Sequence, residues 1–106
     1  MTIAIRQAGP DDAGAVLALV KALAVYEKEA DKVKMTERGA RDALAAGHLH
    51  ALLGFAGDEA VAMALYFFNF SSWTGKRGLF LEDLFVAPDR RGRGVGLQLL
   101  KRLARL

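Results

Sequence analysis

LFLEDLFVAPDRRGRGVGLQLL, residues 79–100, joins an apolar strand to a helix through a turn rich in glycine and arginine. The strand ends at Pro88, which lacks a backbone donor and does not continue a ladder. Glycine at three alternating positions gives the turn unusual backbone freedom. The stretch therefore predicts a strand, a tight turn and an amphipathic helix, whose apolar face is expected to carry Leu99, Leu100, Leu103 and Leu106.

The chain before this stretch predicts one strand, two helices and a hairpin. Residues 2–8 alternate like a strand, and residues 9–29 have helical spacing, with Pro10 or Asp11 at the start and acids in the first turn. A second helix is expected between Thr36 as N-cap and Gly47 as stop signal. Two apolar runs flank Gly57 and Asp58, which is typical of a hairpin turn, and residues 71–78 are expected to form a loop. The order strand, helix, helix, strand, strand, strand, helix indicates an α/β or α+β domain around an antiparallel sheet.

Length and composition favour one soluble domain spanning residues 1–106. The chain has no cysteine, which excludes disulfides, thiolate metal sites and a cysteine nucleophile and fits a reducing compartment. Neither a signal peptide nor an apolar run of the roughly 18 residues that a membrane span needs is visible. We therefore expect a cytoplasmic protein that has no membrane partner, and no pattern suggests a metal site.

The net charge of +3 is concentrated toward the end of the chain. A basic end suits nucleic acid or a phosphorylated small molecule, and it also suits a solvated helix face. Nucleic acid is disfavoured because no aromatic residues are interleaved with the arginines and because Glu82 and Asp83 would repel phosphate.

The glycine-rich turn has the chemistry of an anion site. Glycines let backbone N–H groups approach a ligand closely, and a helix N-terminus adds unpaired N–H groups and partial positive charge. Arg91 and Arg93 offer charge-assisted contacts. The alternative is a tight turn whose arginines only keep it soluble. The motif lacks the Gly-Lys-Ser/Thr end of a Walker A loop and the third glycine of a Rossmann fingerprint, which disfavours ATP and NAD.

RGRGVG, residues 91–96, resembles the Arg/Gln-x-x-Gly-x-Gly/Ala pattern of the GCN5-related N-acetyltransferase (GNAT) superfamily. LAVYEKE at residues 23–29 and ALYFFNFSSWTGKRGLFLEDLFV at residues 64–86 are similar to its diamine (spermidine/spermine) acetyltransferase branch. The resemblance covers the chain from about Leu23 to Leu106. It implies a mixed, mostly antiparallel sheet with helices on both faces, and acetyl-coenzyme A as acetyl donor.

The resemblance also implies which residues hold that donor. Backbone groups of the acidic strand would bind the thioester arm, and amides of the turn would hold the pyrophosphate. The residues concerned are Leu84, Phe85, Val86, Arg91, Gly92, Arg93, Gly94, Val95, Gly96 and Leu97. A buried core strand is the plainer interpretation of the first three, and it is compatible with backbone binding.

Two adjacent acids, Glu82 and Asp83, interrupt the apolar strand, and strand geometry predicts side chains on opposite faces. An ion pair with Lys76, Arg77 or a basic helix residue is one interpretation. The other is that Glu82 attracts a cationic amine and removes its proton, because only a neutral amine attacks a thioester.

The resemblance places Glu82 in contact with the substrate, and Tyr26 and Glu27 beside it. Asp83 would add negative charge for a cationic amine. Trp73 either walls the substrate channel or packs on the core, and we favour packing.

The function expected is transfer of an acetyl group from acetyl-coenzyme A to a primary amine of a polyamine or diamine. The alternative is a non-catalytic coenzyme A-binding or oligomerisation module. Family domains usually continue beyond the helix that starts near Gly94, so we expect an incomplete N-acetyltransferase domain. Its acidic strand would then be an open sheet edge that pairs with a second copy in a homodimer.

Overall fold

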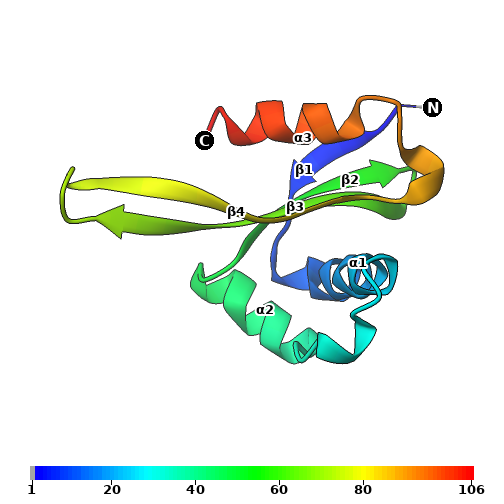
Figure 1. The fold of residues 1–106 in the computed structure, drawn as a ribbon, viewed down its shortest axis with the longest axis horizontal. Helices are drawn as coiled ribbons and strands as arrows, with labels where there is room; N and C mark the ends of the chain where they lie inside the picture. The colour runs from blue at the N-terminus through cyan, green and yellow to red at the C-terminus, as the bar shows by residue number, and fades with distance from the viewer. Residues whose placement is uncertain (1) are drawn as a thin grey trace.

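A sheet of four antiparallel strands separates two layers of helix (Figure 1). The computed structural model describes residues 2–106. The elements in chain order are β1 (Ala4–Gln7), η1 (Pro10–Asp12), α1 (Ala13–Tyr26), η2 (Ala30–Lys32), α2 (Glu37–Ala46), β2 (His50–Ala56), β3 (Glu59–Ser71), β4 (Lys76–Val86), η3 (Pro88–Arg90) and α3 (Val95–Leu103). The expected order of elements and the α/β class are confirmed. None of the helices in this part of the chain is long and apolar enough to span a membrane.

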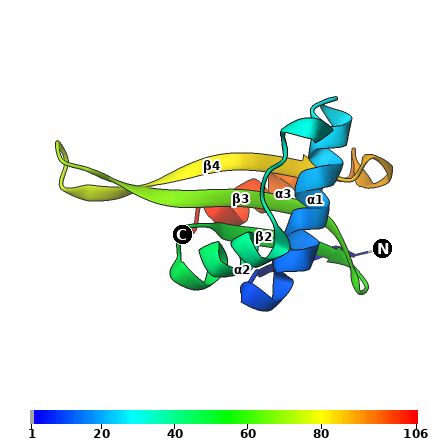
Figure 2. The same cartoon turned by 90° about the horizontal axis from the view of Figure 1, so that it is seen from below.

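Each face of the sheet buries its own apolar cluster, because alternate side chains of a strand point to opposite faces. Leu53, Met63 and Phe85 pack under α1 on one face. Leu52, Ala64 and Tyr66 pack under α3 on the other. Figure 2 shows α1 crossing the sheet on the near side, with α3 behind it. The helices therefore cover both faces, as expected.

The helix ends follow local chemistry, with one correction. The side chain of Thr36 accepts from Gly39 N at 3.0 Å and caps α2, and Gly47 ends it in the left-handed region at φ 77°. The first helix does not begin at Pro10 or Asp11, because Pro10–Asp12 form a short 3₁₀ turn before Ala13.

The apolar stripe of α3 is also narrower than predicted. Val95, Leu99 and Leu103 are buried, whereas Leu100 and Leu106 are 41% and 52% exposed.

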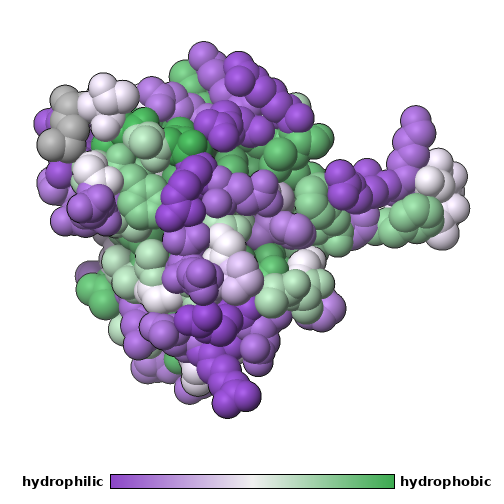
Figure 3. Space-filling model, turned by 180° about the vertical axis from the view of Figure 1, so that it is seen from behind, coloured by the Kyte–Doolittle hydropathy of each residue, from purple (hydrophilic) through white to green (hydrophobic). Residues whose placement is uncertain are grey.

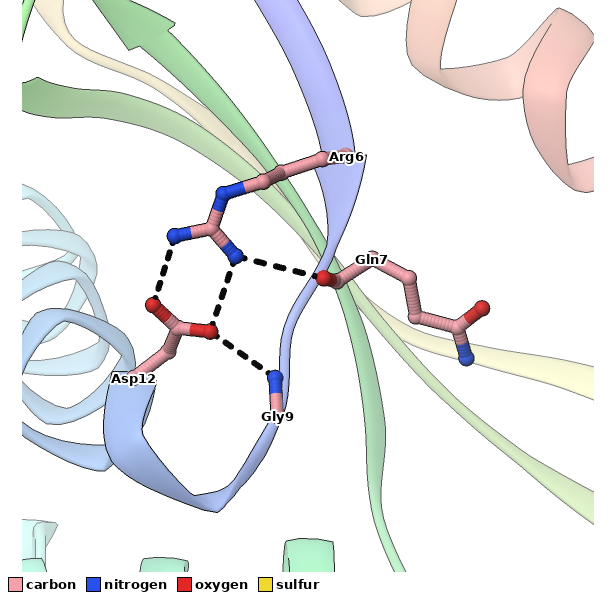
Figure 4. A network of polar contacts seen from close by, with 4 residues as sticks. All are labelled: Arg6, Gln7, Gly9 and Asp12. Carbon is pink, nitrogen blue, oxygen red and sulfur yellow. Dashed lines mark hydrogen bonds and ion pairs between the residues drawn. The ribbon is translucent and has the colours of Figure 1, made fainter.

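The polar network at the start of α1 ties that helix to β1 (Figure 4). Two nitrogens of Arg6 donate to the two carboxylate oxygens of Asp12 at 2.8 and 2.9 Å, and Gly9 N donates to Asp12 at 2.8 Å. The hydrogen bond from Arg6 outweighs the opposing effect of burial and holds the pKa of Asp12 below its usual range. The first turn of α1 is thus fixed against the sheet.

The hairpin of β3 and β4 extends well beyond the helices as a two-stranded arm (Figures 1 and 3). The loop predicted for residues 71–78 is shorter than expected, because Asn69, Phe70 and Ser71 pair with Gly78, Arg77 and Lys76. Trp73 lies at the tip and is 97% exposed, so the prediction that it packs on the core is wrong. Strand pairing continues where no helix covers the sheet, which leaves the tip in solvent.

Candidate active site

A groove of about 370 Å³ lies between the end of α1, the end of β4 and the glycine-rich turn. We call it the loop groove. Its walls are Leu23 and Tyr26 of α1, Leu84, Phe85 and Val86 of β4, and Arg90, Arg91, Gly92, Gly94, Val95 and Gly96 of the turn and of α3. It gathers most of the residues that the sequence assigned to the donor.

The turn adopts a conformation that glycine allows and other residues resist. Gly92 and Gly94 both have φ 79°, and Gly94 is the N-cap of α3 without a side-chain cap. The first hydrogen bond of α3 runs from Gln98 N to Gly94 O at 3.0 Å. The amides of Val95, Gly96 and Leu97 therefore precede the helical ladder at its positive end, which is suited to an anion.

Strand β4 is an edge of the described sheet, and its last residues present backbone groups to the loop groove. Residues 62, 63 and 64 oppose 86, 85 and 84, and Ala87 N donates to Val61 O at 2.8 Å. In an antiparallel ladder, alternate residues exchange hydrogen bonds with the partner strand, so Phe85 faces β3 in this register. The N–H groups of Leu84 and Val86 consequently face away from β3, toward the open edge.

Two residues predicted for the donor site, Arg93 and Leu97, do not line the loop groove. Arg93 lines a separate groove with Ile3 and Gln98. The side chain of Leu97 is 57% exposed and lines neither groove of the candidate site. Arg90 and Leu23 line the loop groove although the sequence did not single them out. The basic run at residues 90–93 was a usable signal for Arg90, whereas nothing in the local pattern distinguishes Leu23 from other leucines of α1.

A bulge in β4 overturns the prediction that Glu82 and Asp83 point to opposite faces. Leu65 pairs with Asp83 but Tyr66 pairs with Leu81, so Glu82 is an extra residue without a counterpart on β3. A bulge interrupts the alternation of side chains and re-aims them locally. Both acids line one groove as a result.

That second groove, the acidic groove, has a volume of about 480 Å³ and lies between α1, η2 and β4. Its acids are Glu27, Glu29, Glu82 and Asp83, and its apolar floor includes Leu23 and Leu65. Burial first, and then the charges of Glu82 and Glu27, raise the pKa of Asp83 above its usual range. Within residues 2–106, no ion pair joins either strand acid to Lys76 or Arg77. The groove therefore concentrates negative charge that the protein does not neutralise at Glu82 or Asp83.

The cations Lys32 and Lys34 also line the acidic groove. Lys32 forms an ion pair with Glu29 at 3.1 Å, and among residues 2–106 no lysine forms one with Glu27, Glu82 or Asp83. These two lysines belong to the polar segment at residues 31–35, between α1 and α2. Its lysines were a possible signal that the segment borders a charged site.

Tyr26 does not line the same groove as Glu27, Glu82 and Asp83, with which the family resemblance places it. It lines the loop groove, where its ring lies 4.2 Å from the guanidinium carbon of Arg91. Glu27, the next residue, lines the acidic groove. Consecutive residues at the end of α1 thus line different grooves. No cluster of three or more potential metal ligands is present in the described part of the chain.

The family model for the acetyltransferase (GNAT) family matches residues 16–106. The chain belongs to the GNAT acetyltransferase family. It is 37% identical over 112 residues to a thialysine N-epsilon-acetyltransferase of Bos taurus, covering 96% of this chain and 65% of the relative. It is 34% identical over 114 residues to a spermidine/spermine N(1)-acetyltransferase-like protein of Homo sapiens, covering 96% of this chain and 16% of that protein. The GNAT chain thus spans about two thirds of the length of the thialysine enzyme, and both relatives fit the diamine branch.

The GNAT fold is also shown by solved structures. A predicted acetyltransferase from Clostridium acetobutylicum, solved with acetyl-CoA, superposes with a TM-score of 0.81 at 19% identity. The match covers 98% of this chain and 72% of that one. At this identity the likeness establishes the fold of the family member described here, not its ligands.

Proposed function

We propose that the protein transfers the acetyl group of acetyl-coenzyme A to a primary amine of a polyamine or related diamine. The observation that supports the proposal is that the acidic groove and the loop groove, which is suited to an anion, adjoin at two consecutive residues of β4. Asp83 lines the acidic groove, and the next residue, Leu84, lines the loop groove. If the acidic groove holds a cationic amine and the loop groove holds a phosphorylated donor, the amine and the thioester would meet between Asp83 and Leu84.

The residues of the loop groove fit the donor. The amides before the α3 ladder and the left-handed Gly92 and Gly94, which have no side chains, would form an anion site. The edge N–H groups of Leu84 and Val86 would bind the pantetheine arm and the thioester oxygen. Arg93, outside the groove, would contribute charge rather than direct contact.

The residues of the acidic groove fit a cationic acceptor. Glu27 and Asp83 would hold the ammonium group remote from the reaction, where their combined charge attracts a second positive centre. Glu82 would accept a proton from the reacting ammonium, directly or through water, which frees the nitrogen lone pair. The nitrogen would then attack the thioester carbonyl carbon, and an edge N–H of β4 would stabilise the oxyanion. When the carbon–sulfur bond breaks, coenzyme A would leave as a thiolate and take up the proton that the attacking nitrogen loses.

Calorimetry and a thiol-release assay with the 106-residue chain test the proposal. We expect saturable binding of acetyl-coenzyme A, and faster release of thiol with thialysine or spermidine than with a monoamine of equal length. Absence of acetyl-coenzyme A binding would contradict the proposal. Binding without turnover of any amine would favour a non-catalytic coenzyme A-binding module instead.

We also propose that residues 1–106 belong to one N-acetyltransferase domain and that two copies associate along β4 before its bulge. Phe80 and Leu81 are 53% and 39% exposed there. An edge strand with exposed apolar side chains is a template for pairing. Sedimentation velocity is expected to show a dimer that dissociates when Leu81 is replaced by Lys. A monomer at all concentrations would contradict this association.

A further inference from the structure

Arg91 joins the three elements that surround the loop groove. Its Nε donates to the carbonyl oxygen of Val86 at 2.8 Å. Its guanidinium carbon lies 4.2 Å from the ring centroid of Tyr26 and 5.5 Å from that of Phe85. One side chain of the glycine-rich turn therefore contacts the end of α1 and the end of β4 together.

These contacts depend on properties that only arginine has. A planar guanidinium stacks over an aromatic ring while a nitrogen in the same plane donates to a carbonyl, and the ammonium of lysine cannot reproduce both. The Nε–H is directed at Val86 and the ring of Tyr26 lies against the guanidinium. The guanidinium of Arg91 thus makes contacts within the protein through its Nε–H and through one of its faces.

Val86, whose carbonyl oxygen accepts the hydrogen bond from Arg91, is also one of the two residues whose N–H faces the open edge of β4. Val86 does not exchange ladder hydrogen bonds with β3 in the observed register, so its C=O and N–H both face the open edge. The bond from Arg91 occupies the carbonyl and leaves the N–H directed to the groove. Fixing the end of β4 in this way sets the geometry of the proposed thioester site.

We propose that Arg91 is a positioning residue that aligns the end of β4 with the end of α1, and that it is not a ligand of the donor's pyrophosphate. This inference rests on the proposed function and deepens it. It replaces the interpretation of Arg91 as a charge-assisted phosphate contact. Phosphate recognition is left to the backbone amides of the turn.

Two substitutions and two ligands separate the alternatives. Arg91→Lys keeps the charge and loses the planar contacts, whereas Arg91→Gln loses both. Coenzyme A contains the pyrophosphate, and pantetheine contains only the arm that β4 would bind. Dissociation constants for both ligands are measured by titration calorimetry or, for weak binding, by ligand-observed NMR. Lys101→Gln, an exposed change on α3 outside the loop groove, controls for loss of one positive charge.

A positioning role predicts that both Arg91 variants weaken coenzyme A and pantetheine by a similar factor of about five. Lys101→Gln is expected to leave both affinities unchanged. A pyrophosphate ligand predicts another pattern: Arg91→Gln weakens coenzyme A about tenfold or more, Arg91→Lys restores most of that loss, and pantetheine binding does not change. That second pattern would overturn the inference.

Tyr26→Leu provides an independent variant if substitution of Arg91 prevents folding, which circular dichroism would reveal. It removes the ring beneath the guanidinium and leaves the charge of Arg91 in place. We expect weaker binding of both ligands and a smaller effect of Arg91→Lys in the Tyr26→Leu background. Unchanged pantetheine binding in Tyr26→Leu would overturn the inference while leaving the proposed function intact. If the unmodified protein binds neither ligand, the proposed function fails and the positioning role fails with it.

Discussion

The two ends of α1 place acidic residues in opposite electrostatic environments. At the first turn, Asp12 accepts hydrogen bonds from Arg6 and Gly9, and its pKa is lowered (Figure 4). Beyond the last turn, Asp83 lies among Glu82 and Glu27, and its pKa is raised. At the first end the carboxylate is hydrogen-bonded within the protein, whereas at the other end the carboxylates line the acidic groove. This contrast separates a structural acid from acids that we assign to function.

The backbone shows the same contrast. Lys28, directly after Glu27, is the one non-glycine residue with positive φ in the described chain, at 60°. It closes α1 with bonds from Lys28 N to Val25 O at 3.0 Å and from Glu29 N to Ala24 O at 2.7 Å. A lysine in this region is strained, and such strain is concentrated at functional sites. The first turn of α1 contains no residue of this kind.

The largest effect is expected from Glu82→Gln, which removes the proposed base from the functional end. Turnover should fall about 10²- to 10⁴-fold, because the substrate ammonium is no longer deprotonated in the site. Thiol release at saturating acetyl-coenzyme A measures it. Glu59→Gln removes the same charge at the exposed start of β3, outside both grooves, and should leave turnover unchanged. An equal rate for wild type and Glu82→Gln would end the assignment of Glu82 as base.

At the first turn of α1, substitution of Asp12 should change the stability of the protein. Asp12→Ala is expected to lower the free energy of unfolding by about 1–3 kcal/mol at pH 7, since it leaves the partly buried Gly9 N–H without its acceptor. The pKa of Asp12 is lower in the folded state, so its stabilisation is present above the unfolded pKa and is lost as the pH falls through the folded value. Urea denaturation at pH 7 and at low pH measures both effects. A loss that is independent of pH would show that the charge of Asp12 is irrelevant.

Lys28→Gly should stabilise the protein by about 0.5–1 kcal/mol, because glycine adopts the left-handed conformation without strain. Lys21→Gly, in the exposed middle of α1, is the matched control and should destabilise by about 1 kcal/mol. Thermal denaturation of both variants gives the comparison. Equal destabilisation by the two changes would show that the end of α1 is not strained.

The smallest effect is expected from Asp83→Asn, and its sign is opposite to that of Asp12→Ala. The pKa of Asp83 is raised in the folded state, so the folded protein loses stability as the pH rises from the unfolded pKa through the folded one. Removing the charge should raise the free energy of unfolding by about 0.5 kcal/mol at pH 7, after allowance for solvent screening, and should change it very little at low pH. Urea denaturation across this range tests the sign. A destabilised Asp83→Asn at pH 7 would show that Asp83 has a stabilising partner.

Sequence patterns predicted features whose cause is local. The N-cap at Thr36, the stop at Gly47 and the turn at Gly57 and Asp58 depend on backbone preferences within a few residues. The glycines at 92 and 94 likewise indicated a turn that only small residues tolerate. The exposure of individual apolar side chains could not be predicted from local patterns, because it depends on which other elements cover them. Trp73 and Leu100 are apolar and yet exposed among the described residues.

By itself, the sequence determined the order of elements, the glycine-rich helix start and the presence of two acids on an apolar strand. Only the tertiary structure decided where those acids point, because the bulge at Glu82 arises from the register between β4 and β3. It also decided that Tyr26 meets Arg91 while Glu27 faces the acids. Both outcomes depend on contacts between residues far apart in the chain, and side-chain direction at such contacts is fixed by packing rather than by local preference.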